Sequence, residues 1–535
     1  MNTDRRQFGV PLLIILAGAC ASILMFWITD YGPGVSPDST TYIETARNLL
    51  AGNGFTVGGK PMTHYPPAYP LLLSIVGLFQ HGDILQAGRL LGALLFGANL
   101  VLFGLAVQMC TARSLSATTC AILFFLCSAP IIVIHSMVWS EALFITFSLA
   151  AFVLLSLHVI RPTLYLLLIA ALMAGFAITT RYVGVTLLPP MAFALLLFGD
   201  RPMKYKIRDT ILSTTVASLP LAFWLIRNVE MAQTATNRTF AIHPFAFHHA
   251  KSLINTMHDF ALPIPISGWT KALILCVATA LFLVALILLR RKNYISRNVT
   301  SARIILPVLC ILFFLTYVAC LMISISFFDA YTPLNTRIML PAFLVLTVAG
   351  ISLAWSLSRA LDKSFLWYSF VFFAFLSISL NGYRAISQAI DIHKNGRGYT
   401  SRYWQGSEIV SYLADVRDGR QIYSNGPDVI RFLTEKEAIM IPNKVFADTR
   451  KVNEDYEDQL NRMFVECREG KVLVAYLNGV TWRWYLPSIE DLESEGNLPV
   501  LRRFEDGVVY ARYPRTAAEQ SPALDGDSVV LHPRQ

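Results

Sequence analysis

The chain has 535 residues, of which 55% are hydrophobic and only 15% charged, and its mean hydropathy is +0.51. This composition excludes a soluble globular protein and predicts a polytopic membrane protein. The net charge of +9 comes mainly from basic residues in short segments between apolar runs. That is the pattern of cytoplasmic loops, so we expect a lipid bilayer as partner and no nucleic acid.

The N-terminal segment is predicted to be an uncleaved membrane anchor. Arg5 and Arg6 precede about twenty apolar residues that end at Thr29, a run longer than the core of a secretory signal. The stretch Ala-Cys-Ala-Ser lies inside this run and not after it, where a cleavage site would be.

Eleven apolar runs are long enough to cross a bilayer, for which about twenty residues are needed. They are residues 10–29, 88–109, 115–135, 141–159, 163–180, 183–199, 209–227, 271–290, 303–326, 338–358 and 364–383. With the N-terminus in the cytoplasm, every inner turn carries basic residues, as the positive-inside rule requires. The run 71–79 is too short to cross, and counting it would place the basic clusters outside. We therefore predict an all-α polytopic membrane domain over residues 1–383.

The first outer loop, residues 30–87, is the most informative stretch of the chain. Ser36-Pro37 precedes Asp38, and Tyr42 and two later apolar residues follow at helical spacing, which predicts a short amphipathic helix with Asp38 near its N-terminus. Four glycines predict a hinge, and Pro66-Pro67 predicts the start of a second surface helix. By itself, Asp38 could be no more than a helix cap.

This loop also carries a resemblance to a known family. The residues DSTTYIETARNLLAGNGF from Asp38, followed by HYPPAYP from His64, resemble the first extracytoplasmic loop of polyprenyl-phosphate-dependent glycosyltransferases of the GT-C type. These include the protein O-mannosyltransferases and the aminoarabinose transferases of lipid A. The resemblance implies that Asp38 is a catalytic base that activates the acceptor.

Glu141 opens a predicted span at its outer end, where an acidic residue can simply stabilise the helix N-terminus. In the resembling family an acidic residue at this place belongs to the active site. The resemblance therefore implies that Glu141 and Asp38 form a facing pair of catalytic carboxylates, the arrangement that general acid and base catalysis requires.

Several arginines lie at the outer ends of spans or in outer loops, where the positive-inside rule disfavours them. Each could extend to a lipid headgroup, or bind a lipid phosphate with its forked donors. To the donor phosphate we assign His64, Arg181, Arg227 and Arg337. To the rest of the substrate we assign Tyr42, Tyr65, Tyr69, Tyr182 and Arg238.

The second large outer loop, residues 228–270, contains His243, His248, His249 and His258. Their spacing matches no metal motif, and the eight cysteines of the chain show no metal or disulfide pattern. We expect this loop to close over the lipid donor. The sequence requires no cofactor and assigns no metal ligand, although a divalent metal stays open because some relatives use one.

After residue 383 the composition becomes mixed, which predicts a small extracytoplasmic α/β domain over residues 384–514 and a disordered tail over 515–535. The predicted strands are residues 421–424, 438–441, 471–476 and 508–512, and the predicted helices are 407–416, 427–435 and 452–463.

Two functions follow. The first is a glycosyltransferase that moves a sugar from a polyprenyl-phosphate donor to a lipid, glycan or protein acceptor, with inversion at the anomeric carbon. It would work on the outer, periplasmic face of a bacterial inner membrane. The second is a polyprenyl-lipid flippase or transporter. Coupled transporters usually keep ionisable residues within their spans, and the predicted spans contain no Asp or Glu away from their ends, which favours the transferase.

Overall fold

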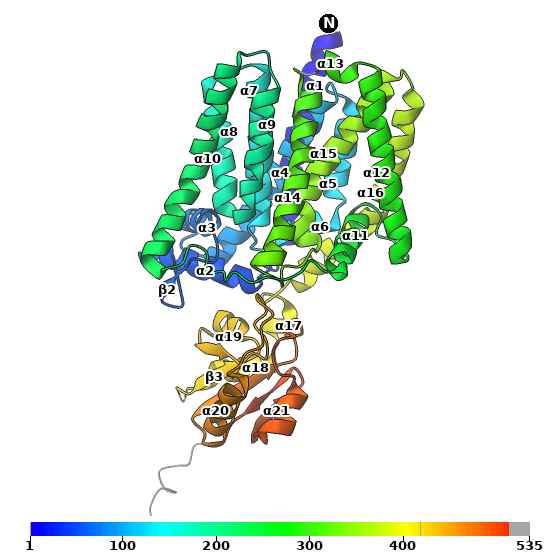
Figure 1. The fold of residues 1–535 in the computed structure, drawn as a ribbon. Coiled ribbons are helices and arrows are strands. Elements are labelled where there is room, and N and C mark those ends of the chain that lie inside the picture. Colours follow the sequence, from blue (N-terminus) through cyan, green and yellow to red (C-terminus); the bar gives the residue numbers. More distant parts are fainter. Residues whose placement is uncertain (1, 299, 418, 513–535) are drawn as a thin grey trace, which may run out of the picture. The chain divides into compact units, whose positions relative to one another are not determined.

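The structure, a computed structural model, describes residues 2–298, 300–417 and 419–512. The chain forms two compact units. The first comprises the described residues up to Gln405 together with Ala447–Arg450, and the second comprises the described residues of Gly406–Phe446 and those from Lys451 to Arg512. The first unit is a bundle of long helices, and the second contains a β-sheet (Figure 1).

The helices of the first unit follow the apolar pattern of the sequence. They are α1 (Asn2–Ile28), α2 (Pro37–Leu50), α3 (Ala68–Leu78), α4 (Ile84–Cys110), α5 (Leu115–Leu126), α6 (Ala129–Ser136), α7 (Glu141–Ile160), α8 (Leu164–Thr180), η1 (Tyr182–Leu187), α9 (Leu188–Leu197), α10 (Met203–Ala232), α11 (Phe247–Ala261), α12 (Gly268–Arg291), α13 (Tyr294–Arg297), α14 (Ala302–Phe327), α15 (Thr336–Ala360), α16 (Ser364–Asn395) and α17 (Arg402–Gln405). Among the described residues, eight helices are long and apolar enough to cross a membrane, or nine if α5 and α6, bent by 57°, form one span.

Each of the eleven predicted spans falls on one of these helices or helix pairs. The difference lies at α8 and at η1 with α9, which are shorter than a typical span. Helix α8 stops because Arg181 adopts an extended backbone, with φ −147° and ψ 131°. The prolines near the start of α9 are tolerated there because they occupy its first turn. The break leaves Arg181 at the end of α8.

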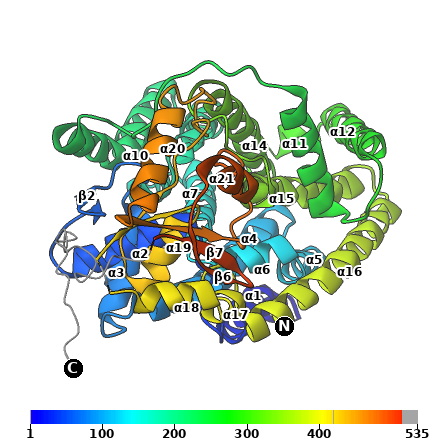
Figure 2. The same ribbon diagram turned by 90° about the horizontal axis from the view of Figure 1, so that it is seen from below.

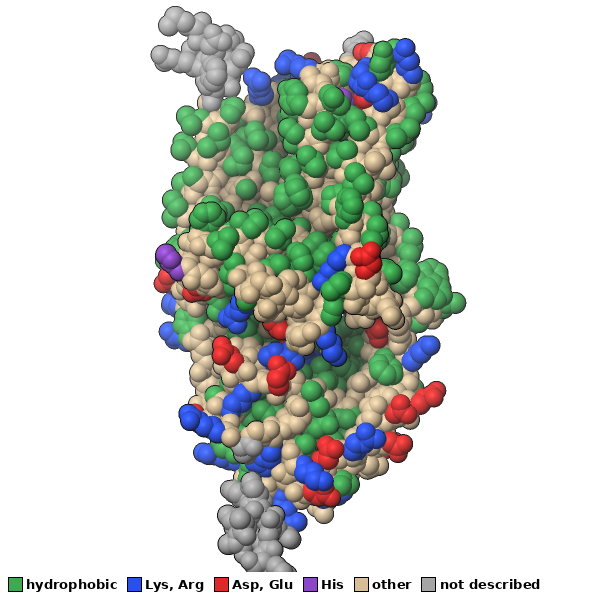
Figure 3. Space-filling view, turned by 90° about the vertical axis from the view of Figure 1, so that its left-hand side faces the viewer, with side chains coloured by type: hydrophobic (Ala, Val, Ile, Leu, Met, Phe, Trp, Pro, Cys, Tyr) green, Lys and Arg blue, Asp and Glu red, His purple; other side chains and the backbone are tan. Residues whose placement is uncertain are grey.

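The helices pack around an apolar interior, and the ends of the bundle differ. The buried core contains mainly Phe, Ile, Leu, Val and Ala side chains. Figure 1 shows α2, α3, α6 and α11 at one end of the bundle, here called the α2 end, and the N-terminus of α1 and α13 at the other. Seen along the bundle, α14 and α15 lie between α10 on one side and α12 on the other (Figure 2). Hydrophobic side chains cover a broad band of one side of the bundle (Figure 3), as a lipid-facing surface requires.

Short backbone bridges hold the segment before α2 against two distant parts of the chain. Gly34 pairs with Met137, and Val35 pairs with Gly398. The Val138 N–H donates to the Gly34 carbonyl at 2.9 Å, and the Tyr399 N–H donates to the Val35 carbonyl at 2.8 Å. These bridges bring the start of α2 beside the start of α7.

The rest of the first outer loop matches its predicted helix, hinge and helix. Helix α2 begins at Pro37 and α3 at Ala68, while strands β1 (Thr56–Val57) and β2 (Lys60–Pro61) form a small antiparallel hairpin between them. The second predicted loop, residues 228–270, contains the end of α10, an extended stretch and α11.

The second unit contains a five-stranded sheet of order β4-β3-β5-β7-β6. Strands β3 (Gln421–Ser424), β4 (Ala438–Met440) and β5 (Val472–Leu477) are parallel, and β6 (Val500–Phe504) and β7 (Gly507–Tyr510) are antiparallel to their neighbours. Its helices are α18 (Glu408–Asp415), α19 (Pro427–Thr434), α20 (Tyr456–Arg468) and α21 (Ile489–Gly496).

Sequence analysis misses two elements of this unit and places one boundary too early. Strand β6 has a mostly exposed and charged sequence, and α21 buries only Leu492 and Gly496, so neither shows a clear apolar period. The boundary at residue 383 lies inside α16, which continues through the buried Gly382 to Asn395 and ends at Gly396, where φ is +66°. The predicted tail, residues 515–535, lies outside the described residues.

Candidate functional site

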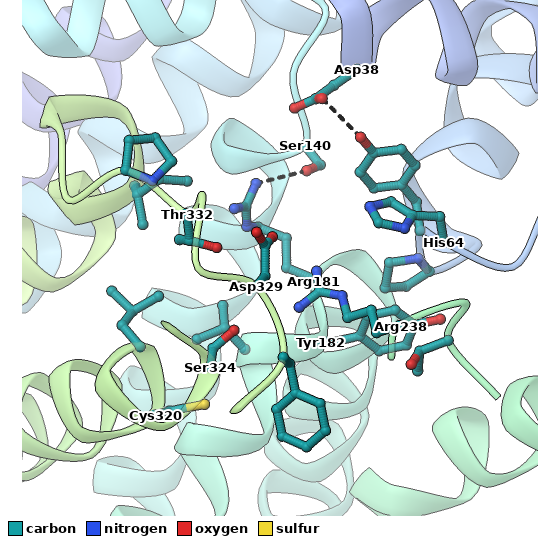
Figure 4. A pocket seen from close by; sticks show the side chains of 18 of the residues that line it. Asp38, His64, Ser140, Arg181, Tyr182, Arg238, Cys320, Ser324, Asp329 and Thr332 are labelled. Carbon is teal, nitrogen blue, oxygen red and sulfur yellow. Dashed lines mark hydrogen bonds between the residues drawn. The ribbon is translucent and has the colours of Figure 1, made fainter. Parts of the chain in front are cut away.

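A cavity of about 540 Å³ opens at the α2 end of the bundle. Its walls come from α2, the segment before α3, the turn before α7, the break between α8 and η1, the extended stretch after α10, the end of α14 and the turn that leads into α15. It therefore collects side chains from segments that are far apart in the sequence (Figure 4).

Four charged side chains form an ion cluster at this cavity. Arg337 donates from Nε to Glu141 Oε1 and from an Nη to Asp38 Oδ2, each at 2.6 Å. Arg181 approaches Glu141 Oε1 at 2.6 Å and donates to Ser140 Oγ at 3.2 Å. The two carboxylates predicted from the sequence thus lie on either side of one guanidinium group.

Glu141 occupies the buried side of this cluster. Its side chain has no exposed surface, and it does not line the cavity, whereas Arg181, Arg337 and Asp38 all do. Its second oxygen, Oε2, has no hydrogen-bond partner among the described residues. The geometry fits a carboxylate that orients two guanidinium groups and leaves the reaction space to Asp38.

Asp38 sits in the first turn of α2 and faces the cavity. Its Oδ1 accepts a hydrogen bond from the Tyr65 hydroxyl at 2.8 Å (Figure 4). Burial by itself would raise the pKa of Asp38, but the adjacent Arg337 and the Tyr65 hydrogen bond outweigh it and hold the pKa below its ordinary value. Asp38 is therefore ionised at neutral pH.

The predicted tyrosines of the first loop form an aromatic cluster behind Asp38. Tyr42 contacts the rings of Tyr65 and Tyr69 edge-on, at centroid distances of 5.0 and 5.1 Å, and its hydroxyl lies 3.3 Å from Ser140 Oγ. Burial, and then the nearby Asp38 charge, raises the pKa of Tyr42 and Tyr65, so both hydroxyls stay protonated. Tyr42 and Tyr65 line the cavity, while Tyr69 is buried outside the lining.

His64, Tyr182 and Arg238 line another part of the cavity. Burial, followed by the positive charge of Arg238, lowers the pKa of His64, so the imidazole is neutral at pH 7 and can offer a hydrogen bond but no charge. The Tyr182 hydroxyl donates to the Thr63 carbonyl at 3.1 Å. The buried Nε of Arg238 has no hydrogen-bond partner among the described residues.

Arg227 lies elsewhere. Its guanidinium donates to the carbonyl oxygens of Met62 and Phe55, at 2.8 and 3.0 Å, and packs on Trp224. It is absent from the cavity lining. Because its N–H groups donate to backbone carbonyls of the first loop, Arg227 holds that loop against α10.

Three further residues of the site were not singled out from the sequence. Trp139 lies under Arg337, 4.0 Å from the guanidinium carbon to the ring centroid, and donates from Nε1 to Ser36 Oγ at 2.7 Å. Ser140 bonds to Arg181, and Asp329 lines the cavity from the turn before α15. Their position in predicted outer turns was the available signal.

The described residues contain no group of three His, Cys, Asp or Glu side chains that could hold a metal ion. The histidines of the second loop have other neighbours: His243 Nε2 bonds to the Thr449 carbonyl at 2.6 Å, His248 contacts His249, and His258 pairs with Asp259.

Comparison with known proteins identifies the fold. No protein-family model and no curated protein sequence matches the chain. Among solved structures, apo ArnT from Cupriavidus metallidurans aligns over 95% of this chain and 99% of its own, with a TM-score of 0.56 and 13% identity. The same protein bound to undecaprenyl phosphate gives a TM-score of 0.53 and 14% identity over the same shares. The chain has the GT-C fold.

A second protein supports this GT-C assignment. The oligosaccharyltransferase AglB from Archaeoglobus fulgidus, in complex with an inhibitory peptide and a dolichol-phosphate, aligns over 87% of this chain and 69% of its own, with a TM-score of 0.52 and 12% identity. The fold expected from the resemblance of the first loop is therefore confirmed.

Proposed function

We propose that this protein is an integral membrane glycosyltransferase that takes a sugar from a polyprenyl-phosphate donor. The observation that carries the proposal is the ion cluster at the cavity, in which ionised Asp38 faces the open space and two arginines are held beside it. The fold is compatible, since ArnT has been solved with undecaprenyl phosphate and AglB with a dolichol-phosphate.

The donor phosphate would be bound by Arg181 and Arg238, with His64 as an uncharged hydrogen-bonding group. Both guanidinium groups line the cavity, and Arg238 retains an unpartnered Nε. Negative charge on the phosphate rises as its bond to the sugar breaks, so donors that are already oriented stabilise the transition state more than the ground state. Glu141 supports this role by fixing Arg181 and Arg337. Arg227 would contribute only through the position of the loop.

Asp38 would act as the base. The acceptor hydroxyl attacks the anomeric carbon from the face opposite the phosphate, the carbon–oxygen bond to the phosphate breaks, and its electron pair leaves with the phosphate. The acceptor proton passes to Asp38, and the anomeric configuration inverts. A carboxylate with a lowered pKa takes this proton as the new bond forms, when the hydroxyl has become strongly acidic.

The acceptor would be a lipid, a glycan or a protein, and the reaction would take place on the periplasmic side of a bacterial inner membrane. The flippase alternative has less support. In the described spans, aspartate and glutamate occur only within the first two or last two turns, as with Glu141, Asp209, Glu230 and Asp391, which is unfavourable for ion coupling at the midplane.

The proposal is tested with labelled undecaprenyl-phosphate sugars and membrane extract, comparing wild type with Asp38→Asn. Label is expected in a new product with wild type alone, and the mass of that product identifies the acceptor. Normal turnover by a folded Asp38→Asn protein would refute the proposed role of Asp38. Movement of the lipid between leaflets with no product would support the flippase.

A further inference from the structure

Two carboxylates line the cavity, and the mechanism above uses one of them. The other belongs to Asp329, in the turn between α14 and α15. In the view of Figure 4, Asp329 lies between Thr332 and Arg181. No role follows for it from proton transfer or phosphate binding.

The turn that carries Asp329 is held from several sides. The Ala241 N–H donates to the Phe327 carbonyl at 3.0 Å, and the Ala330 N–H donates to the Asp448 carbonyl at 2.9 Å. Within the turn, Asp329 Oδ1 accepts from the Tyr331 N–H at 3.1 Å. The carboxylate is therefore presented to the cavity by an ordered backbone, as precise recognition requires.

Asp38 pairs with Arg337, whereas Asp329 has no ion-pair partner among the residues that the structure describes. No Lys, Arg or His nitrogen of the described chain lies within 4.0 Å of its carboxylate, and Oδ2 makes no hydrogen bond to the described residues. Its negative charge nonetheless acts across the cavity, since it opposes the lowering of the pKa of His64. Asp329 thus faces the same space as the residues that would bind the donor.

An unpaired carboxylate repels a phosphate, so the donor phosphate belongs beside Arg181 and Arg238 and away from Asp329. What remains of the donor is the sugar, whose hydroxyl groups are hydrogen-bond donors. Ser324, Thr332 and Asn335 also line the cavity and add hydroxyl and amide groups to the same wall. An ionised carboxylate accepts such hydrogen bonds more strongly than a neutral group does.

We propose that Asp329 determines donor specificity by accepting hydrogen bonds from hydroxyl groups of the transferred sugar. The inference rests on the proposed glycosyltransferase function and adds the place of the sugar within the cavity. A site built around such a hydrogen bond rejects a sugar that lacks the matching hydroxyl, because the carboxylate would then lose water without gaining a hydrogen-bond donor from the sugar.

The experiment uses the full-length protein in detergent, a panel of undecaprenyl-phosphate monosaccharides, and undecaprenyl phosphate without a sugar. For the donor that wild type uses best, Asp329→Asn is expected to lower kcat/KM by about 10- to 100-fold, the range for loss of a hydrogen bond to a charged group. Binding of undecaprenyl phosphate alone should be unchanged or tighter, because a repulsive charge has been removed. If Asp329 had a purely structural role, the substitution would lower kcat/KM and would also weaken binding of undecaprenyl phosphate.

The substitution is chosen to preserve the turn, since an asparagine oxygen can still accept from the Tyr331 N–H. The matched control is Glu230→Gln, which removes one negative charge from an exposed position in the last turns of α10 and should leave both measurements unchanged. With wild type, a deoxy donor that lacks the recognised hydroxyl should have a kcat/KM as low as that of Asp329→Asn with the intact donor. With Asp329→Asn, removing this hydroxyl should lower kcat/KM no further.

The outcomes separate this inference from the function on which it rests. If wild type transfers no sugar from any donor of the panel, the proposed function fails. If wild type transfers sugar and Asp329→Asn keeps the same kcat/KM across the panel, the role of Asp329 is refuted and the transferase stands.

Discussion

Replacing Glu141 by glutamine tests whether a fully buried carboxylate orients the arginine side chains of the site. In the structure one carboxylate oxygen accepts from both Arg337 and Arg181 at 2.6 Å. Glu141→Gln removes the charge that balances these guanidinium groups and leaves Arg337 with Asp38 as its remaining carboxylate partner. We expect Arg337 to shift toward Asp38 and both arginines to lose their orientation.

The size of the effect follows from burial, because Glu141 has no exposed surface. Removing one member of a buried ion pair costs about 3–5 kcal/mol. If the whole cost appears in the transition state, kcat falls by about 150- to 5,000-fold, since about 1.36 kcal/mol is tenfold in rate. Any part of this cost that does not appear in the transition state would instead lower the melting temperature of the variant.

The assay is single-turnover sugar transfer, with KM and thermal unfolding measured on the same preparations. A positioning role predicts that kcat falls far more than KM rises, and that Glu141→Asp, which keeps the charge, recovers part of the rate. Glu230→Gln serves as the control for loss of one carboxylate at the α2 end. A folded Glu141→Gln protein with kcat within about twofold of wild type would refute the reasoning, since this would mean less than about 0.5 kcal/mol of transition-state stabilisation.

Three other predictions concern the phosphate, the segment before α2 and pH. Arg238→Ala should weaken binding of undecaprenyl phosphate by about 10- to 100-fold, with only partial recovery in Arg238→Lys because an ammonium lacks the planar fork; equal binding by both variants and wild type would contradict the assignment. Gly398→Ala should lower the free energy of unfolding by at least about 1–3 kcal/mol, because φ is +62° and the new Cβ would meet the Val35 carbonyl oxygen. An unchanged melting temperature would contradict this prediction and show that the bridge between Val35 and Gly398 can move. The stabilising effect of the Asp38 charge, measured against Asp38→Asn, should be constant from about pH 8 to about pH 5. Because the folded pKa is depressed, this contribution is complete above the ordinary value of 3.8 and is lost as pH falls through the lower folded value; a difference that already declines near pH 6 would be inconsistent with a lowered pKa.

Much of the architecture can be predicted from the sequence because its causes are local. Long apolar runs locate the spans, since each must satisfy its own backbone hydrogen bonds in lipid. The Ser36-Pro37 signal locates the start of α2, and the acid at position 141 marks the start of α7. The same reasoning identified Asp38, Glu141 and Arg337 as residues of one face, and the structure brings them into one cluster.

Their separate places in that cluster could not be predicted. Asp38 and Arg337 are 299 positions apart, and the distance between them depends on helix packing and on backbone bridges such as Val35 with Gly398. No feature of the local sequence distinguishes Arg227 from Arg238. Arg227 donates hydrogen bonds to backbone carbonyls of the first loop, whereas Arg238 lines the cavity. Composition and periodicity therefore determined the membrane class and the spans, and the resemblance of the first loop implied the catalytic carboxylates. Only the tertiary structure decided which carboxylate is buried, which faces the cavity and which is unpaired, because burial and pairing depend on neighbours that are remote in the chain.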